Sequence, residues 1–201
     1  MATVTRLYDD YAQARQAVRS LEAAGIPSSD ISIAANNSDG WYNNKVDRDL
    51  DGTDDRAEGA ATGAGLGATL GGAAGVLTGL GIMAIPGAGP IVAAGWLASL
   101  AAGAVAGGAT GGIIGALTQS GVSEDEANVY AEGLRRGGSI VTVRTDEASR
   151  ARIESLLDSS AVNWRTRADT WRKDGWNKYD PAASPYTSDQ VRAERDRYIG
   201  Q

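Results

Sequence analysis

The chain has 201 residues, enough for one ordinary domain with additions, and it contains no histidine and no cysteine. These absences remove the commonest general base, the commonest metal ligand and all thiol chemistry. The net charge of −6 disfavours nucleic acid as a partner. We therefore expect a protein that is not an enzyme, that does not bind nucleic acid and for which no small-molecule substrate is evident.

Residues 1–36 have the pattern strand, helix, strand. Thr3–Tyr8 is rich in β-branched residues, although Val4 and Leu7 do not share a face of a strand. Asp9 or Asp10 is placed to cap a following helix, which ends near Gly25. Ile31–Ala35 then alternates as a half-buried strand does. The first residues contain no apolar signal core, so we expect the protein on the cytoplasmic side of the inner membrane or in a cytoplasmic assembly.

Residues 37–58 form an acidic loop, and its last twelve residues, Asp47–Glu58, match the calcium-loop pattern. Oxygen ligands at this spacing suit calcium, and Gly52 permits the sharp turn of such loops. The predicted ligands are Asp47, Asp49, Asp51, Thr53, Asp55 and Glu58. Asp54 stands where the pattern has an apolar residue, and no amphipathic helix leads into the loop. The alternative is an acidic turn that stabilises the start of the next helix through its dipole.

Residues 59–121 contain two series with glycine at every fourth position, Gly59–Gly79 and Gly103–Gly115, the second extended backwards by Ser99 and Gly95. Both lie within an uncharged run of 65 residues from Gly59 to Ser123. Each glycine costs a helix about 1 kcal/mol relative to alanine, so these helices need close packing of their small residues. The pattern predicts a hairpin of two helices, about Gly59–Ile82 and Pro90–Leu117. The predicted helix-packing positions are Gly59, Gly63, Gly67, Gly71, Gly75, Gly79, Gly95, Ser99, Gly103, Gly107, Gly111 and Gly115.

Each predicted helix has about the 20 residues that a bilayer core requires, but strongly apolar side chains are few. Small residues on more than one face favour a homo-oligomer, and membrane lipid is the expected second partner. Two alternatives remain open: a soluble assembly whose hairpins bury one another, and a flexible linker. The gly-ala-gly sequence at 63–65 is not a phosphate-binding loop, because its glycines belong to a helix-periodic series.

Residues 122–168 repeat the order of the first segment. Ser123 and Glu126 form a capping box before a helix that stops at Gly137, and Ser139–Thr145 follows as a strand. A further helix buries Ile153 and Leu157, and Val162–Thr166 alternates as a last strand. The two halves predict an α+β fold, a ferredoxin-like split βαβ sandwich with the helical hairpin inserted between its second and third strands. Residues 31–35 and 139–145 must then be neighbours.

Residues 169–201 form an aromatic and charged tail, in which Thr187–Tyr198 has the composition of a short helix. The tail has no sustained apolar stripe. Two interpretations remain: it docks a partner, or it packs on its own domain or is partly disordered.

The segments Val4–Asp9, Leu21–Ile26, Asp30–Ile33 and Gly137–Val143 resemble the bacterial general stress protein family (17M type), whose members are induced by heat or low temperature. The resemblance covers roughly residues 3–35 and 122–167. It implies a stress-induced bacterial protein with a ferredoxin-like core, a glycine-rich insertion and no catalytic residues to transfer.

The combined expectation is a non-enzymatic, stress-associated scaffold that oligomerises through its glycine-rich hairpin in or on a membrane. The alternative is a soluble, calcium-responsive protein that assembles without lipid.

Overall fold

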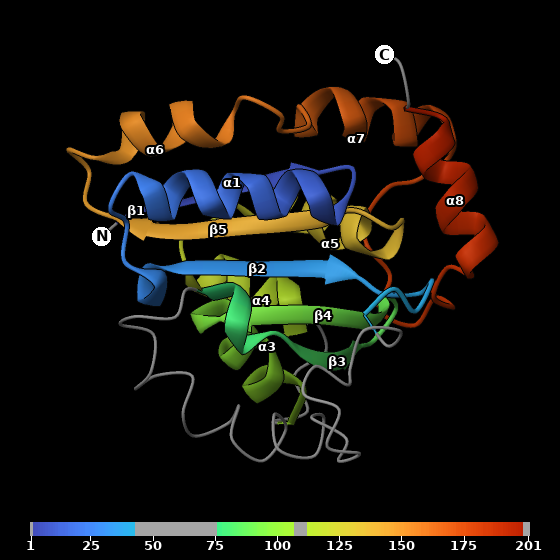
Figure 1. Ribbon diagram of the computed structural model, residues 1–201. Coiled ribbons are helices and arrows are strands. Elements are labelled where there is room, and N and C mark those ends of the chain that lie inside the picture. The colour runs from blue at the N-terminus through green and yellow to red at the C-terminus, as the bar shows by residue number, and fades with distance from the viewer. Residues whose placement is uncertain (1, 43–75, 107–111, 199–201) are drawn as a thin grey trace.

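The computed structural model describes residues 2–42, 76–106 and 112–198 (Figure 1). Its strands are β1 (Ala2–Tyr8), β2 (Ile31–Asn36), β3 (Gly81–Ile85), β4 (Gly89–Gly95) and β5 (Ser139–Thr145). Its helices are α1 (Tyr11–Ala23), α3 (Trp96–Ala106), α4 (Gly112–Gln119), α5 (Glu124–Arg135), α6 (Arg150–Leu157), α7 (Trp164–Lys173) and α8 (Ser188–Asp196). Short 3-10 helices lie at Ser28–Asp30 (η1) and Val76–Gly79 (η3). The predicted α+β class is confirmed.

The five strands form one antiparallel sheet in the order β1-β5-β2-β4-β3. Ile31 of β2 is paired with Val143 of β5, so the predicted neighbourhood of residues 31–35 and 139–145 is confirmed. An isolated bridge joins Leu7 of β1 to Val162, on the side of β1 away from β5.

Helices cover both faces of this sheet. Helices α1 and α6 pack together on one face, and α3, α4 and α5 lie on the other, as Figure 1 shows. Val4 and Tyr8 belong to the core beneath α1 and α6, whereas Leu7 belongs to the opposite core. A strand buried on both faces needs no alternation of apolar and polar residues, which explains why Val4 and Leu7 do not share a face.

Local capping signals operate where the sequence places them. The Asp10 carboxylate accepts the backbone N–H of Gln13 at 2.8 Å, which caps α1. The Ser123 hydroxyl accepts the backbone N–H of Glu126 at 3.4 Å, which caps α5. Gly25 and Gly137 follow these two helices with positive φ angles of 84° and 103°, as helix ends often require.

The middle of the insertion differs from the predicted helical hairpin. The segments Gly81–Ile85 and Gly89–Gly95 are paired strands, and the predicted second helix divides into strand β4 and the two shorter helices α3 and α4. The β-branched residues Ile91 and Val92 favour a strand here, and β4 is stabilised by pairing with both β2 and β3. No helix in the described ranges reaches the length and apolarity that crossing a bilayer requires.

The predicted last strand, Val162–Thr166, is also wrong beyond its first residue. Val162 donates its backbone N–H to Leu7 at 2.7 Å, and α7 then begins. The side chain of Asn163 caps this helix by accepting the N–H groups of Arg165 and Thr166. Trp164, Ala168 and Trp171 fall at helical spacing, and the latter two are buried.

The C-terminal tail packs on its own domain. Trp171, Trp176, Tyr179 and Val191 are buried. The predicted helix within Thr187–Tyr198 is present as α8, and Thr187 starts it with a capping box. In Figure 1 this helix lies beyond the ends of the central strands, so the tail wraps one end of the sheet.

Candidate assembly surface

The predicted site residues fall partly inside the described ranges. The proposed calcium ligands, Asp47, Asp49, Asp51, Thr53, Asp55 and Glu58, all lie outside them. The same holds for Gly59, Gly63, Gly67, Gly71, Gly75, Gly107 and Gly111. In the ranges that are described, no group of three or more acidic side chains is arranged to hold a metal ion. The calcium loop therefore stays a prediction.

Gly95 is described but is not a helix-packing residue. It ends strand β4 with a φ of +90°, and a Cβ at this position would meet Ser32 Oγ at 2.5 Å and the carbonyl oxygen of Ile31. Both a left-handed backbone and a close approach to β2 require glycine here. The four-residue spacing that assigned Gly95 to a helix was therefore misleading.

The remaining small-residue positions are open. Gly79 in η3, Gly103 in α3 and Gly115 in α4 have no atom within 4 Å of the place that a Cβ would occupy. Ser99, one turn before Gly103, is also exposed. Helices α3 and α4 pack on each other and bury Leu97, Ala101, Ile113 and Leu117 instead. The small residues of this part of the insertion therefore face away from the core of their own chain.

Two large apolar side chains accompany this open surface. Ile82 of β3 is 44% exposed and Leu100 of α3 is 40% exposed, and they are the exposed large hydrophobic residues of the described ranges. Neither was predicted as a site residue. The runs Ile82–Ile85 and Ile91–Ala94, separated by a Pro-Gly-rich turn, are a hairpin signal that would have located Ile82 on a strand.

Strand β3 is the outermost strand of the sheet in the described part of the chain, and its register shows which of its backbone groups face outward (Figure 1). Ala84 is opposite Pro90, which has no N–H and whose carbonyl oxygen accepts the N–H of Asn37 beyond β2. This pair cannot exchange hydrogen bonds. Since hydrogen-bonded and non-bonded pairs alternate, Met83 bonds inward to β4, whereas the N–H and C=O groups of Ile82 and Ala84 point away from it.

Two tyrosines occupy the ends of this outer edge. Tyr42 Oη donates to the carbonyl oxygen of Leu80 at 2.8 Å, and Tyr179 Oη donates to the carbonyl oxygen of Pro86. Tyr179 is itself held by a hydrogen bond from its backbone N–H to Asn128 on α5. Burial raises the pKa of its hydroxyl, so this donor stays protonated. The edge between the tyrosines consists of Ile82, Met83 and Ala84.

The C-terminal tail also seats the β3–β4 turn. A Cβ at Gly87 would lie 2.6 Å from the carbonyl oxygen of Asp180, and one at Gly89 would lie 2.8 Å from Pro185. Both glycines have positive φ angles. The position of β3 therefore depends on residues that follow it by about a hundred positions.

A buried charged cluster holds that tail in place. Glu132 of α5 is fully buried and accepts Arg136 Nε at 2.6 Å and Arg135 Nη1 at 3.2 Å. Glu194 of α8 accepts Arg136 Nη1 at 3.2 Å and the indole N–H of Trp171 at 2.9 Å. The carboxylates and guanidinium groups of this cluster form salt bridges with one another, which indicates a structural role.

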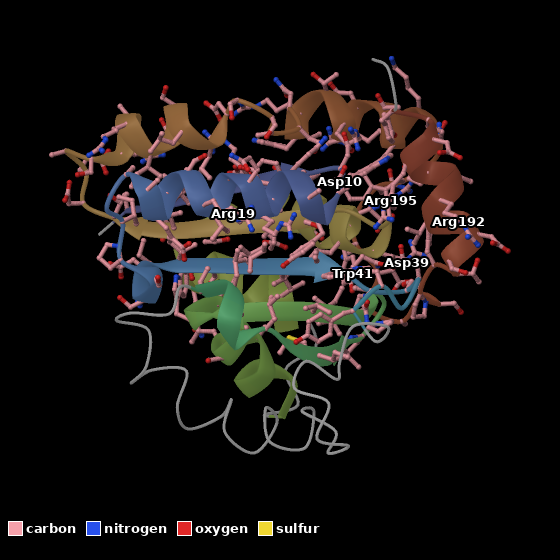
Figure 2. All side chains as sticks on the ribbon, in the orientation of Figure 1. Asp10, Arg19, Asp39, Trp41, Arg192 and Arg195 are labelled. Carbon is pink, nitrogen blue, oxygen red and sulfur yellow. The ribbon has the colours of Figure 1, made fainter. Side chains whose placement is uncertain are left out.

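The same end of the sheet has a further ion pair and a small cavity. Arg195 of α8 pairs with Asp39 at 3.1 Å, and both are labelled in Figure 2. The cavity lined by Tyr8, Arg136, Arg167 and Glu194 holds about 10 Å³, the space of a single water molecule. It has no room for a substrate.

Comparison with known proteins adds no relative: no family model, no curated protein and no solved structure matches the chain.

Proposed function

We propose that the protein is a non-enzymatic scaffold that assembles from copies of itself through its uncharged insertion. One observation carries this proposal: the exposed large apolar side chains of the described ranges, Ile82 and Leu100, both lie in the insertion. The open small-residue positions Gly103 and Gly115 belong to the same segment. Small residues let the backbones of two molecules approach closely, and contiguous exposed apolar patches mark interaction sites.

The order of the strands in the sheet supports a link to the stress response. The order Val162, β1, β5, β2, with antiparallel neighbours, is that of a split βαβ sandwich whose fourth strand is reduced to one bridge. Strands β4 and β3 extend it beyond β2. We infer a ferredoxin-like core on this basis, and the resemblance to the general stress protein family then suggests a stress-associated role for the assembly.

Membrane attachment is a second candidate, favoured by the 65-residue run without charged side chains. In the described part of that run, however, Ile91, Leu97, Ile113 and Leu117 are buried in the core of their own chain. These side chains are not free to enter lipid while the domain is folded. Self-assembly therefore ranks ahead of insertion into a membrane.

Size-exclusion chromatography with light scattering tests the proposal, comparing wild type with the double variant Gly103→Leu, Gly115→Leu. Both positions have open space, and leucine is a better helix former than glycine, so the domain should remain folded. We expect an oligomeric wild type and a smaller variant. The control is Ala193→Leu, which places one leucine side chain at an exposed position of α8, outside the insertion.

A wild type that is monomeric at every concentration examined would overturn the proposal. Flotation with liposomes separates the two candidates: an oligomer that remains at the bottom of the gradient supports assembly without lipid, and one that floats supports membrane attachment.

A further inference from the structure

The outer edge of β3 offers a small and defined set of backbone groups. The N–H and C=O groups of Ile82 and Ala84 face outward, and the flanking carbonyl oxygens of Leu80 and Pro86 are already bonded by Tyr42 and Tyr179. Within the described ranges no strand pairs with this edge. Ile82 and Ala84 are exposed, and an open sheet edge is a template for pairing with another strand, so a second strand is the natural complement.

The composition of β3 does nothing to prevent such pairing. Its residues, Gly81–Ile85, carry no charge and include no proline. Natural proteins usually protect an open edge with lysine, proline or a bulge. The opposite edge of the sheet shows protection of another kind, because Val162 bonds to Leu7 and Arg6 pairs with Asp158 at 2.5 Å.

We propose that β3 pairs with β3 of a second copy of this chain, antiparallel and about a two-fold axis at Met83. This inference rests on the proposed self-assembly and specifies one of its contacts. The axis places Ile82 opposite Ala84 of the partner, so both outward N–H groups and both outward C=O groups of each copy find a partner. Met83 then faces the same residue of the other copy in a pair without hydrogen bonds.

The ends of the edge agree with this register. The next hydrogen-bonded pair would join Leu80 to Pro86 of the partner, and Pro86 has no N–H to donate. The carbonyl oxygen of Leu80 instead accepts Tyr42 of its own chain at 2.8 Å, and that of Pro86 accepts Tyr179. The two tyrosines therefore limit the pairing to residues 82–84 and define its centre.

The chain's own residues 43–75 are a poorer occupant. Their 33 positions are mostly glycine, alanine, aspartate and asparagine, which are depleted in strands. Ile82, Met83, Ala84 and Ile85 have a more suitable composition, and a two-fold contact satisfies the same surface on both copies at once.

Cysteine crosslinking tests the register directly, because the chain has no cysteine of its own. In the proposed dimer the Cα atoms of a Met83→Cys pair lie about 4.5 Å apart, within reach of a disulfide. The control Ala84→Cys is one residue away, but its two copies are diagonal neighbours at about 7–8 Å, beyond disulfide reach. Wild-type oligomers are measured in parallel by light scattering.

We expect Met83→Cys to form a covalent dimer under mild oxidation at least about tenfold faster than Ala84→Cys. Adding Ala84→Pro to Met83→Cys removes one outward N–H from each copy, leaves the bonds to β4 intact and should slow the crosslinking about tenfold. Circular dichroism confirms that each variant is folded. Equal rates for the two single variants, or no effect of the proline in a folded protein, would overturn the inference. If wild type assembles and Met83→Cys does not crosslink, the β3 contact is wrong and the proposed function stands; a monomeric wild type refutes both.

Discussion

The hydroxyl of Tyr179 donates a hydrogen bond to the carbonyl oxygen of Pro86, a residue 93 positions earlier in the chain. This contact connects the aromatic tail to the turn between β3 and β4. It makes the tail a structural support for the insertion, and it explains why residues outside the sandwich are buried.

The variant Tyr179→Phe isolates that contact. Phenylalanine keeps the buried ring and removes the donor, so the free energy of unfolding should fall by about 1 kcal/mol, the usual net value of such a bond. Urea denaturation measures this change. The control is Tyr186→Phe. Tyr186 belongs to the same tail as Tyr179, and its ring lies against Arg135 of α5. An equal loss in both variants would contradict a specific role for the Tyr179 hydroxyl.

Glu132 should be among the costliest single positions in the domain. Glu132→Gln leaves Arg135 and Arg136 without their buried carboxylate, and breaking such a pair from one side costs about 3–5 kcal/mol. The matched control is Asp189→Asn, because Asp189 pairs with Arg192 on the surface and should change stability by less than about 0.5 kcal/mol. Thermal unfolding of the two variants compares them. Similar losses would show that burial of Glu132 has little energetic effect.

Two glycines of the predicted ladder should respond in opposite directions. Gly95→Ala places a side chain against β2 in a left-handed conformation, so we expect a loss of about 2 kcal/mol or more. Gly103→Ala fills open space in a helix and should stabilise it by about 0.5–1 kcal/mol. Chemical denaturation measures both. A stabilised Gly95→Ala would mean that β4 does not end against β2 as described.

Alkaline pH should unfold the protein through its buried tyrosines. Burial raises the pKa of Tyr8 and of Tyr130 above the ordinary value of about 10. The folded state then holds these protons more tightly than the unfolded chain. Their contribution to stability is complete below about pH 10 and is lost as the pH rises beyond it, by up to about 1.4 kcal/mol per pH unit for each tyrosine.

Urea denaturation across that pH range checks this expectation. In Tyr8→Phe the dependence on pH should be shallower, since one buried titrating hydroxyl is removed. A stability that stays level from neutral pH to well above pH 10 would contradict the effect.

The acidic loop predicts calcium binding that calorimetry can measure. Titration of wild type with calcium should release or absorb heat, and Asp51→Asn together with Glu58→Gln should abolish the signal, because both carboxylates are expected ligands. Magnesium serves as the control ion, since it tolerates this ligand geometry poorly. A wild type without heat at millimolar calcium would refute the site.

The elements that could be predicted from sequence are those with local signals. Asp10, Ser123 and Gly137 determine the ends of α1 and α5 through contacts within a few residues. The glycine spacing before β3 matches a helix, so the sequence does not predict this strand. Strand β3 pairs with β4, and β4 in turn pairs with β2, which is a contact between distant segments. The strand predicted at Val162–Thr166 is wrong for a different, local reason: Asn163 caps a helix, so the pairing of Val162 ends after one bridge.

The candidate surface was predicted only in part. Ser99, Gly103 and Gly115 are exposed as a packing stripe requires, but Ile82 and Leu100 were not identified. Whether these two side chains are exposed depends on which of the neighbouring apolar residues are buried in the core instead. Spacing along the chain carries no information about that choice.

The pairing of β1 has a consequence for biosynthesis. The side chains of Thr5 and Thr142 form a hydrogen bond although the two residues are 137 positions apart. Val162, which forms a bridge with Leu7 of the same strand, is synthesised later still. At about 5–20 residues per second, strand β1 waits on the order of 10 seconds after its own synthesis before β5 is made. Strand β2, in contrast, meets β4 well before then. Strand β1 should therefore be vulnerable during translation, and a chaperone that shields it would raise the yield of folded protein.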